Sequence, residues 1–313
     1  MKLQQLRYFR EIVRQGLSIS DAAQALHTSQ PGISKQIRLL EEELGGAIFV
    51  RNRNRVMEIT PAGQAMLAVV HRMLDDSENL KRIGKDFSNE HSGSLTVITT
   101  HTQARYALPK VIKRFVARYP AVRLGLRQGT PSQIWQTVEN GGADIAIASE
   151  PREAHPALLM LKCYDLPRVV LTPPRHPLLK LERLTLAAVA QYPIITYDEE
   201  FIGHSKVRRA FAARGLAPHL VLNAMDTDVI KAYVELGLGI AIVARMAFDP
   251  RRDRNIRAID AAHLFEFNTV YVGFRRNNYL RRYALDFIEM LAPHLNRKIV
   301  QSAIDDSGIK FPA

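Results

Sequence analysis

Apolar positions recur at helical spacing in two short segments near the start of the chain, with the polar turn His27-Thr28-Ser29 between them. The first segment follows Ser18 and Ser20, which are N-cap candidates, and its apolar stripe is Ile19, Ala22, Ala23 and Leu26. The second begins at Gln30-Pro31, where a first-turn proline is tolerated, and stops at Gly45-Gly46. Its apolar residues are Ile33, Ile37, Leu40 and Leu44. The pattern predicts a helix-turn-helix.

The free face of the second predicted helix is polar and basic. It carries Gln30, Ser34, Lys35 and Arg38. Amide side chains pair with adenine edges, cations pair with guanine or phosphate, and a hydroxyl pairs with either. This face therefore suits the major groove of duplex DNA.

A short basic hairpin is predicted next. Residues 48–50 and 56–59 form its strands around the run Arg51-Asn52-Arg53-Asn54-Arg55. Arginines at a hairpin tip suit phosphates or the minor groove, and the alternative is a solvated loop. Beside the helix pair, we expect a wing that completes a DNA-binding domain over residues 1–60.

A long helix is predicted from residue 61. Residues at alternating spacings of three and four form a coiled-coil seam along it, and all of them except one aspartate are apolar. They are Met66, Val69, Met73, Asp76, Leu80, Ile83 and Phe87. A helix of roughly 25 residues would be nearly 40 Å long, which favours pairing with a second copy. The alternative is an amphipathic helix that lies on its own domain. The polar run SNEHSGS then indicates a hinge, so residues 61–92 form the linker and dimerisation segment.

Strand-like and helix-like segments alternate from residue 93 onward, which is typical of an α/β domain with ligands at the strand ends. We expect a two-lobed domain over residues 93–313. Lobe one covers about 93–162 and 269–300, and lobe two covers about 163–268. The predicted class is a multi-domain chain with an N-terminal all-α winged helix-turn-helix, a long linker helix and a C-terminal α/β domain whose lobes close on a small ligand.

The stretch TTHTQARYALP places hydroxyls and an amide where the first strand of lobe one turns into a helix. Free N–H groups at a helix start favour an anion, and Thr100, Thr102 and Gln103 add neutral donors. Pro109 either starts the main helix or kinks it after one turn. The alternative is that the threonines only cap their own helix.

The net charge of +12 suggests a polyanionic partner, but most of the excess lies outside the first ninety residues. DNA binding must therefore come from local placement, and the arginine clusters near residues 251–257 and 275–282 are interpreted as solvated surface. Cys163 excludes an internal disulfide and is expected in the core. The charged N-terminal segment and the lack of a long apolar run predict a cytoplasmic protein without a membrane partner.

An enzyme and a transport binding protein are the alternatives. The chain contains no H-E-x-x-H, G-x-S-x-G or glycine-rich phosphate loop. His101 lies near the possible anion site, but no nucleophile or second titratable partner is near it in sequence. The basic N-terminal domain argues against a transport protein. We expect no enzymatic activity, no metal and no cofactor.

The block AAQALHTSQPGISKQIRLLEEELGGAIFVRNRNRVMEITPAG resembles the DNA-binding domain of LysR-type transcriptional regulators. The resemblance implies a two-lobed effector domain similar to periplasmic binding proteins, and a linker helix that pairs two chains, with tetramers common. It also implies contact with RNA polymerase at the promoter. The residues that would face promoter DNA are Gln30, Pro31, Ser34, Lys35 and Arg38, with a wing arginine that matches Arg51 or Arg53.

The segments TTHTQARYALP, FVARYP and DVIKAYVELGLGIAIVA resemble the CysB-type subgroup, which controls sulfur acquisition and cysteine synthesis. The resemblance implies a small anionic effector of sulfur metabolism, such as sulfate, adenosine phosphosulfate, O-acetylserine or N-acetylserine. The implied effector residues are Thr100, Thr102, Gln103, Ser149, Ile202, Gly203 and Thr227.

The chain departs from the subgroup at two positions. Ile202 replaces a usual threonine, and Leu166 stands near a usual tryptophan. These departures leave the effector open, and a regulator of alkanesulfonate or sulfate-ester utilisation is the alternative.

Overall fold

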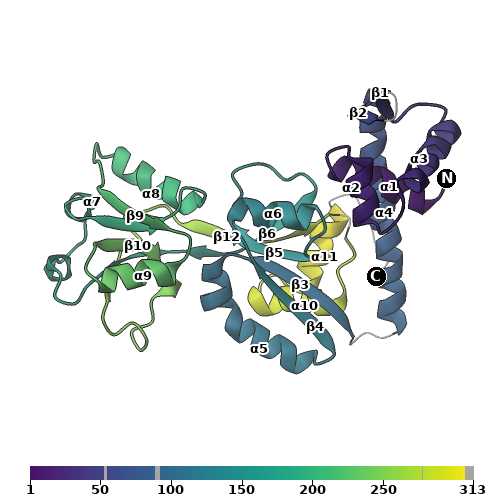
Figure 1. Ribbon diagram of the computed structural model, residues 1–313. Coiled ribbons are helices and arrows are strands. Elements are labelled where there is room, and N and C mark those ends of the chain that lie inside the picture. Colours follow the sequence, from purple (N-terminus) through teal and green to yellow (C-terminus); the bar gives the residue numbers. More distant parts are fainter. Residues whose placement is uncertain (53–54, 89–91, 277, 307–313) are drawn as a thin grey trace. The chain divides into compact units, whose positions relative to one another are not determined.

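The computed structural model describes residues 1–52, 55–88, 92–276 and 278–306. The chain divides into two units (Figure 1). The N-terminal unit comprises residues 1–88 with 277–279, and the C-terminal unit comprises residues 89–276 with 280–313.

The N-terminal unit contains α1 (Leu3–Arg14), α2 (Ile19–Ala25), α3 (Gln30–Leu44), the hairpin β1 (Phe49–Asn52) and β2 (Arg55–Ile59), and α4 (Pro61–Ser88). The hydroxyl of Ser18 accepts the backbone N–H of Asp21 at the start of α2, and Ser29 caps α3 in the same way. Gly45, with φ of +70°, ends α3 in the left-handed conformation. These caps confirm the predicted helix-turn-helix.

The core of this unit depends on α1, which the sequence pattern did not single out. Phe9 of α1 is fully buried and meets Phe49 of β1 edge to face, with ring centroids 5.4 Å apart. One expectation about α3 is wrong: Leu44 is 41% exposed, whereas Glu41 is buried. The buried face of α3 ends at Glu41 because the carboxylate accepts hydrogen bonds from the hairpin backbone. A Cβ at Gly63 would lie 2.3 Å from the carbonyl oxygen of Ile48, so only glycine lets α4 start against the hairpin.

Helix α4 divides its apolar residues between two faces. Leu67, Val70 and Leu74 are buried in the core of the N-terminal unit, as the alternative of a helix lying on its own domain requires. Two seam positions remain outside, because Val69 is 44% exposed and Leu80 is 71% exposed. Two other seam positions, Met66 and Met73, pack against that core. The predicted pairing surface is therefore only partly open in this chain, and dimerisation stays a prediction.

Lobe one of the C-terminal unit contains a sheet of β3 (Gly93–Thr99), β4 (Val122–Gln128), β5 (Ile145–Ser149), β6 (Leu158–Leu166) and β12 (Asn268–Arg275) in the order β4-β3-β5-β12-β6. Its helical segments are the π-helical turn η1 (Gln103–Ala107), α5 (Leu108–Arg118), α6 (Pro131–Glu139), α10 (Arg282–Leu291) and α11 (Arg297–Asp306). Ile145 and Ile147 of β5 pack into the cluster with α5 and α10, whereas Ala146 and Ala148 pack against α6. Helices thus cover both faces of the sheet (Figure 1).

Lobe two contains β7 (Arg168–Thr172), β8 (Ile194–Tyr197), β9 (Leu220–Ala224), β10 (Ile240–Ala244) and β11 (Arg257–Asp260) in the order β11-β7-β10-β8-β9. Its helical segments are η2 (Pro177–Lys180), α7 (Leu186–Val189), α8 (Ile202–Ala212), α9 (Thr227–Glu235) and η3 (Arg245–Ala247). Alternate residues of β10 again point to opposite layers: Ile242 packs with Phe211 of α8, and Val243 packs with Ile230 of α9. The α/β architecture with two lobes is confirmed.

Two boundaries differ from the expectation, and one helix was not expected. The chain passes into lobe two at Pro167, later than near residue 163, because β6 stays paired with β12 as far as Leu166. The last predicted helix, α10, begins at Arg282, later than about residue 278, and α11 follows it unpredicted. Cys163 is 6% exposed within the core of lobe one, as expected. Over the part of the chain that the structure describes, no helix has the length and apolar character to cross a bilayer.

Candidate functional site

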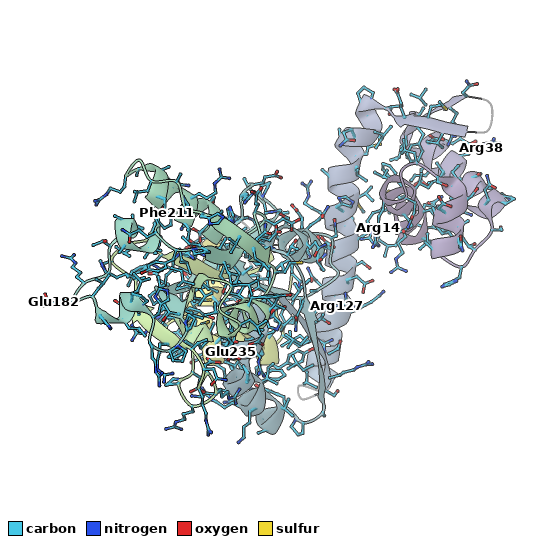
Figure 2. The ribbon with its side chains drawn as sticks, turned by 60° about the vertical axis from the view of Figure 1, so that its left-hand side comes forward. Arg14, Arg38, Arg127, Glu182, Phe211 and Glu235 are labelled. Atoms are coloured by element: carbon cyan, nitrogen blue, oxygen red, sulfur yellow. The ribbon has the colours of Figure 1, made fainter. Side chains whose placement is uncertain are left out.

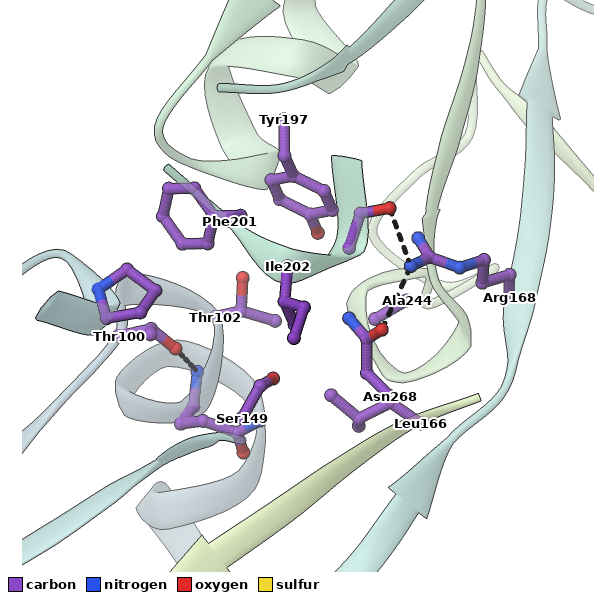
Figure 3. A pocket seen from close by; sticks show the side chains of 13 residues that line it. Thr100, Thr102, Ser149, Leu166, Arg168, Tyr197, Phe201, Ile202, Ala244 and Asn268 are labelled. Carbon is purple, nitrogen blue, oxygen red and sulfur yellow. Dashed lines mark hydrogen bonds between the residues drawn. The ribbon is translucent and has the colours of Figure 1, made fainter. Parts of the chain in front are cut away.

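A cavity lies between the lobes of the C-terminal unit, where β3 and β5 end and where α6 and α8 begin (Figure 3). We call it the inner cavity. It offers about 40 Å³ to the centres of water-sized molecules, which is room for a few waters or one small oxyanion. Its lining residues are Thr100, Thr102, Gln103, Pro131, Ser149, Leu166, Arg168, Tyr197, Phe201, Ile202, Gly203, Ala244 and Asn268.

Polar groups of lobe one form one wall. Thr100, Thr102 and Gln103 are each less than 10% exposed. The hydroxyl of Thr100 lies 3.5 Å from the backbone nitrogen of Gln103, so Thr100 does cap its own helix, as the alternative interpretation holds. The side-chain carbonyl of Gln103 accepts a hydrogen bond of 2.6 Å from Tyr164, which leaves the amide group of Gln103 as a donor. Ser149 at the end of β5 adds another hydroxyl.

The helix that follows β3 opens with an unusual turn. Its residues His101 and Thr102 are α-helical, η1 is a π-helical turn, and α5 continues from Leu108. Pro109 lacks an N–H and would crowd the carbonyl group of Arg105 in a regular α-helix. The wider π turn falls at this place, and such turns are frequent at functional sites. Pro109 thus lies in the first turn of the main helix α5, as one of the two expectations holds, and residues 100–103 remain at the beginning of the whole helical segment.

The second lobe contributes Ile202 and Gly203, at the start of α8. Thr227 does not line the inner cavity, although it was expected to bind the effector. It is fully buried at the start of α9, and its hydroxyl lies 2.6 Å from that of Tyr197 and 3.3 Å from that of Thr102. Thr227 therefore positions Thr102 across the cleft and supports the cavity from behind.

A charged residue that sequence reasoning missed lines this cavity. Arg168, the first residue of β7, is 3% exposed, and burial lowers its pKa to about 10 although Tyr197 and Glu150 oppose the shift. At neutral pH the guanidinium remains charged. Its Nη2 donates to the carbonyl oxygen of Gly203 at 3.0 Å and to Oδ1 of Asn268 at 3.2 Å (Figure 3). Its Nε has no hydrogen-bond partner among the described residues.

Gly203 is a glycine because Arg168 lies against it. A Cβ at this position would meet Nη2 of Arg168 at 2.9 Å and Nδ2 of Asn268 at 2.8 Å. The signal for Arg168 in the sequence was a lone arginine directly before the apolar run VVLT, at the crossing between lobes. That signal is weak, since an arginine at a strand end is usually solvated.

An ionic cluster joins the lobes beside the cavity. The hydroxyl of Tyr106 donates to Asp228, and Arg105 and Lys231 each approach this carboxylate at 3.3 Å. Burial works against the charged form of Asp228, but the hydrogen bond from Tyr106 and the charge of Lys231 lower its pKa overall. His101 lies 3.9 Å from the same carboxylate and does not line the inner cavity. These side chains form contacts between the two lobes.

The predicted DNA-binding residues share the outer face of α3. Gln30, Pro31, Lys35 and Arg38 are exposed, and Ser34 is half-buried. Figure 2 shows Arg38 on this helix. Open amide, hydroxyl and cationic groups on one face are those that reading a duplex requires.

Of the two candidate wing arginines, the structure describes Arg51. Arg51 forms an ion pair of 2.7 Å with Glu41, whose other oxygen accepts the backbone N–H groups of Ile48 and Phe49. Arg51 thus holds the hairpin to α3, a role that the sequence did not reveal. Arg53 lies outside the described residues. Within the described ranges, no group of His, Cys, Asp and Glu is arranged to hold a metal ion.

Comparison with known proteins assigns both units. The family described as "Bacterial regulatory helix-turn-helix protein, lysR family" matches residues 3–64, and "LysR substrate binding domain" matches residues 88–296. The chain is 50% identical over 296 residues to the HTH-type transcriptional regulator SsuR of Burkholderia cenocepacia, covering 95% of this chain and 96% of that protein. It is 47% identical to the regulator CysB of the same organism, with 97% of each chain covered.

A solved structure of a related domain also matches this chain. The cofactor-binding domain of the Cbl transcriptional regulator matches with a TM-score of 0.66 and 42% identity, over 69% of this chain and 95% of that one. Two family descriptions, placed end to end along the chain, correspond to the helix-turn-helix unit and to the two-lobed unit. The chain is therefore a member of the LysR family of DNA-binding transcriptional regulators.

Proposed function

We propose that this chain regulates genes of sulfur assimilation and cysteine biosynthesis, and that a small anion of sulfur metabolism in the inner cavity controls it. The observation that carries the proposal is the buried Arg168, a charged residue in the wall of a cavity otherwise lined by neutral groups. A buried cation is costly unless an anion pairs with it. The family assignment excludes an enzyme, and the relatives named CysB and SsuR support the sulfur context.

Backbone groups favour the same ligand charge. The helix at His101, helix α6 at Pro131 and helix α8 at Ile202 all begin at or beside the cavity. The first N–H groups of a helix lack partners within the helix and attract negative charge. With the hydroxyls of Thr102 and Ser149, the site offers the donors that the oxygens of an oxyanion accept.

The mechanism requires two chains. Pairing through the exposed α4 positions Val69 and Leu80 sets two recognition helices on a partly palindromic promoter site. The effector binds between the lobes, changes the arrangement of subunits in a dimer or tetramer, and so alters promoter contact with RNA polymerase. It shifts this balance only by its difference in affinity between the two arrangements.

The test uses the full chain and a promoter fragment from a sulfur-assimilation operon. Calorimetric titration with sulfate, thiosulfate, adenosine phosphosulfate, O-acetylserine and N-acetylserine measures the affinity of each. Gel retardation with and without each ligand measures its effect on DNA binding. At least one ligand should bind and change the retardation pattern. If no sulfur compound binds, or binding leaves the DNA complex unchanged, the proposal is wrong.

Ile202 and Leu166 favour a second candidate within the same class. Both are apolar residues in the cavity wall, where a hydroxyl and an indole N–H would help to hold a bare inorganic anion. The alternative is therefore a regulator of alkanesulfonate or sulfate-ester utilisation.

A further inference from the structure

The inner cavity has a mixed lining of polar and apolar side chains. Arg168 lies on one side with Leu166, Thr100 and Ser149 lie on the other, and Ile202 lies between them (Figure 3). A tetrahedral anion with oxygens in all directions would turn at least one oxygen toward carbon, and a buried unpaired oxygen costs free energy. The cavity therefore suits an anion in which an apolar substituent replaces one oxygen or extends from it.

The charge of the cavity also limits its ligand. Among the lining residues that the structure describes, Arg168 is the formally charged one. One buried guanidinium compensates one full negative charge, so the second charge of a sulfate dianion would be met only by the partial charges of the helix starts. A monoanion matches the site in charge.

A second cavity, the outer cavity, adjoins the first. It offers about 490 Å³ by the same measure as the inner cavity, and both are lined by Pro131 and Ile202. Pro131 begins α6 in lobe one and Ile202 begins α8 in lobe two, so one residue of each lobe forms the partition. A bare oxyanion would occupy the inner cavity and leave the outer one to water, whereas a substituent on the anion would pass the flexible side chain of Ile202.

The outer cavity is acidic at its rim. Its ionisable lining residues are Glu139, Glu150, Glu153, Glu200, Arg152 and His155. Glu139 pairs with His155 at 2.9 Å, and Glu150 pairs with Lys206, so both of these carboxylates are partnered. Glu153 and Glu200 are exposed and place two negative charges at the rim against the one positive charge of the exposed Arg152. Such a rim repels a substituent that carries a further negative charge.

We propose that the effector of this chain is an organic monoanion of the form R–SO₃⁻ or R–OSO₃⁻. Its oxyanion head binds Arg168 in the inner cavity, and its neutral or cationic substituent passes Ile202 into the outer cavity. This inference rests on the proposed function, because it names the class of anion that the regulatory site takes. Sulfonates and sulfate monoesters share the head chemistry, and the experiment separates them.

The experiment is calorimetric titration of the full chain with sulfate, propane-1-sulfonate, propyl sulfate and sulfoacetate. At least one of the two propyl compounds should bind roughly tenfold or more tightly than sulfate, since its substituent buries several CH₂ groups. The tighter of the two identifies a sulfonate or a sulfate ester as the source. Sulfoacetate, which carries a carboxylate on its substituent, should bind more weakly than propane-1-sulfonate. Sulfate that binds as tightly as both propyl compounds overturns the proposal.

Variants locate the substituent. Ile202→Thr adds a hydroxyl to the partition and should tighten sulfate binding. The affinity ratio of the tighter propyl compound to sulfate should therefore fall at least threefold. Ile299→Thr, at an isoleucine that is 46% exposed on α11, is the matched control and should change nothing. Glu153→Gln should narrow the gap between sulfoacetate and propane-1-sulfonate, whereas Glu182→Gln at a distant exposed site (Figure 2) should not. An unchanged preference in Ile202→Thr overturns the path past Ile202.

The outcomes also separate this inference from the proposed function. Tight sulfate binding that changes DNA retardation, with weak propyl compounds, leaves the sulfur regulator standing and removes the organic effector. Failure of every anion to bind removes both. An equal affinity for sulfoacetate and propane-1-sulfonate shows that the substituent does not enter the outer cavity.

Discussion

Gly203→Ala tests whether the cavity depends on the close contact between α8 and Arg168. The added methyl group would lie 2.9 Å from Nη2 of Arg168 and 2.8 Å from Nδ2 of Asn268. Carbon contacts at rest are about 3.5–4.0 Å, so both side chains must move. Arg168 is buried and Asn268 is half-buried, and a hydrogen bond joins the two side chains.

The magnitude follows from three contributions to the free energy of unfolding. Overpacking a buried site costs about 1–3 kcal/mol. The complete loss of a hydrogen bond from a charged donor costs about 1.5–3 kcal/mol, and a weakened bond costs part of this. Replacing glycine with alanine in the first turn of a helix returns up to about 1 kcal/mol through the unfolded state. The net expectation is a loss of about 2–3 kcal/mol, or roughly 5–10 °C in the melting temperature of a domain of this size.

The assay is thermal unfolding of the full chain, with and without saturating propane-1-sulfonate. In Gly203→Ala, the melting temperature should fall, and the stabilisation by the anion should shrink because Arg168 is displaced. The matched control is Gly46→Ala, where an added Cβ meets nothing within 4 Å and φ is not left-handed. If Gly203→Ala melts like the wild type and keeps the full anion response, Arg168 is not held by Gly203, and its assignment to the anion fails.

Further predictions concern both units. Thr102→Ala should weaken effector affinity by about tenfold while basal DNA retardation stays intact, because one hydroxyl donor is worth roughly 1.4 kcal/mol; equal affinity in both proteins refutes the site. Arg38→Ala should reduce the salt dependence of DNA binding by about one phosphate contact, and Arg127→Ala should leave it unchanged in a retardation series. Leu80→Asp should weaken self-association in sedimentation without lowering the unfolding midpoint, since Leu80 is 71% exposed; an intact oligomer places the dimer contact elsewhere. Burial raises the pKa of Cys163 to about 12, so its thiolate is scarce at pH 8, and alkylation should be slow in the folded protein and fast in urea.

Local signals made the N-terminal unit readable from the sequence. Serine caps, a left-handed glycine and apolar spacing are all set by residues a few positions apart, so α2 and α3 could be placed from them. Leu44 was misjudged because helical spacing says where a stripe lies and not where the domain beneath it ends. Glu41 took the buried place through hydrogen bonds to the hairpin, and such long-range partners leave no local trace.

Some residues of the candidate site could likewise be predicted from the sequence, and others could not. Thr100, Thr102 and Gln103 could be predicted because they are adjacent and follow one strand. Arg168 could not, since its role arises only when β7 brings it beside Gly203 and Asn268, which are distant in sequence. The place of Thr227 behind Thr102, and not in the cavity wall, likewise depends on how two helix starts meet across the cleft.

The balance between the lobes limits what an effector can do. The cluster around Asp228 joins the lobes without a ligand, but its side chains are open to water: Asp228 is 40% exposed and Arg105 is 50% exposed. Ion pairs of this kind contribute about 0–1 kcal/mol each. An anion at the buried Arg168 acts in a less screened site, where charge-assisted hydrogen bonds are stronger. A ligand shifts an equilibrium only by its difference in affinity between two arrangements of the lobes. Because the ion pairs around Asp228 are weak, they do not lock one arrangement, and the contact of the anion with the buried guanidinium supplies the difference in affinity.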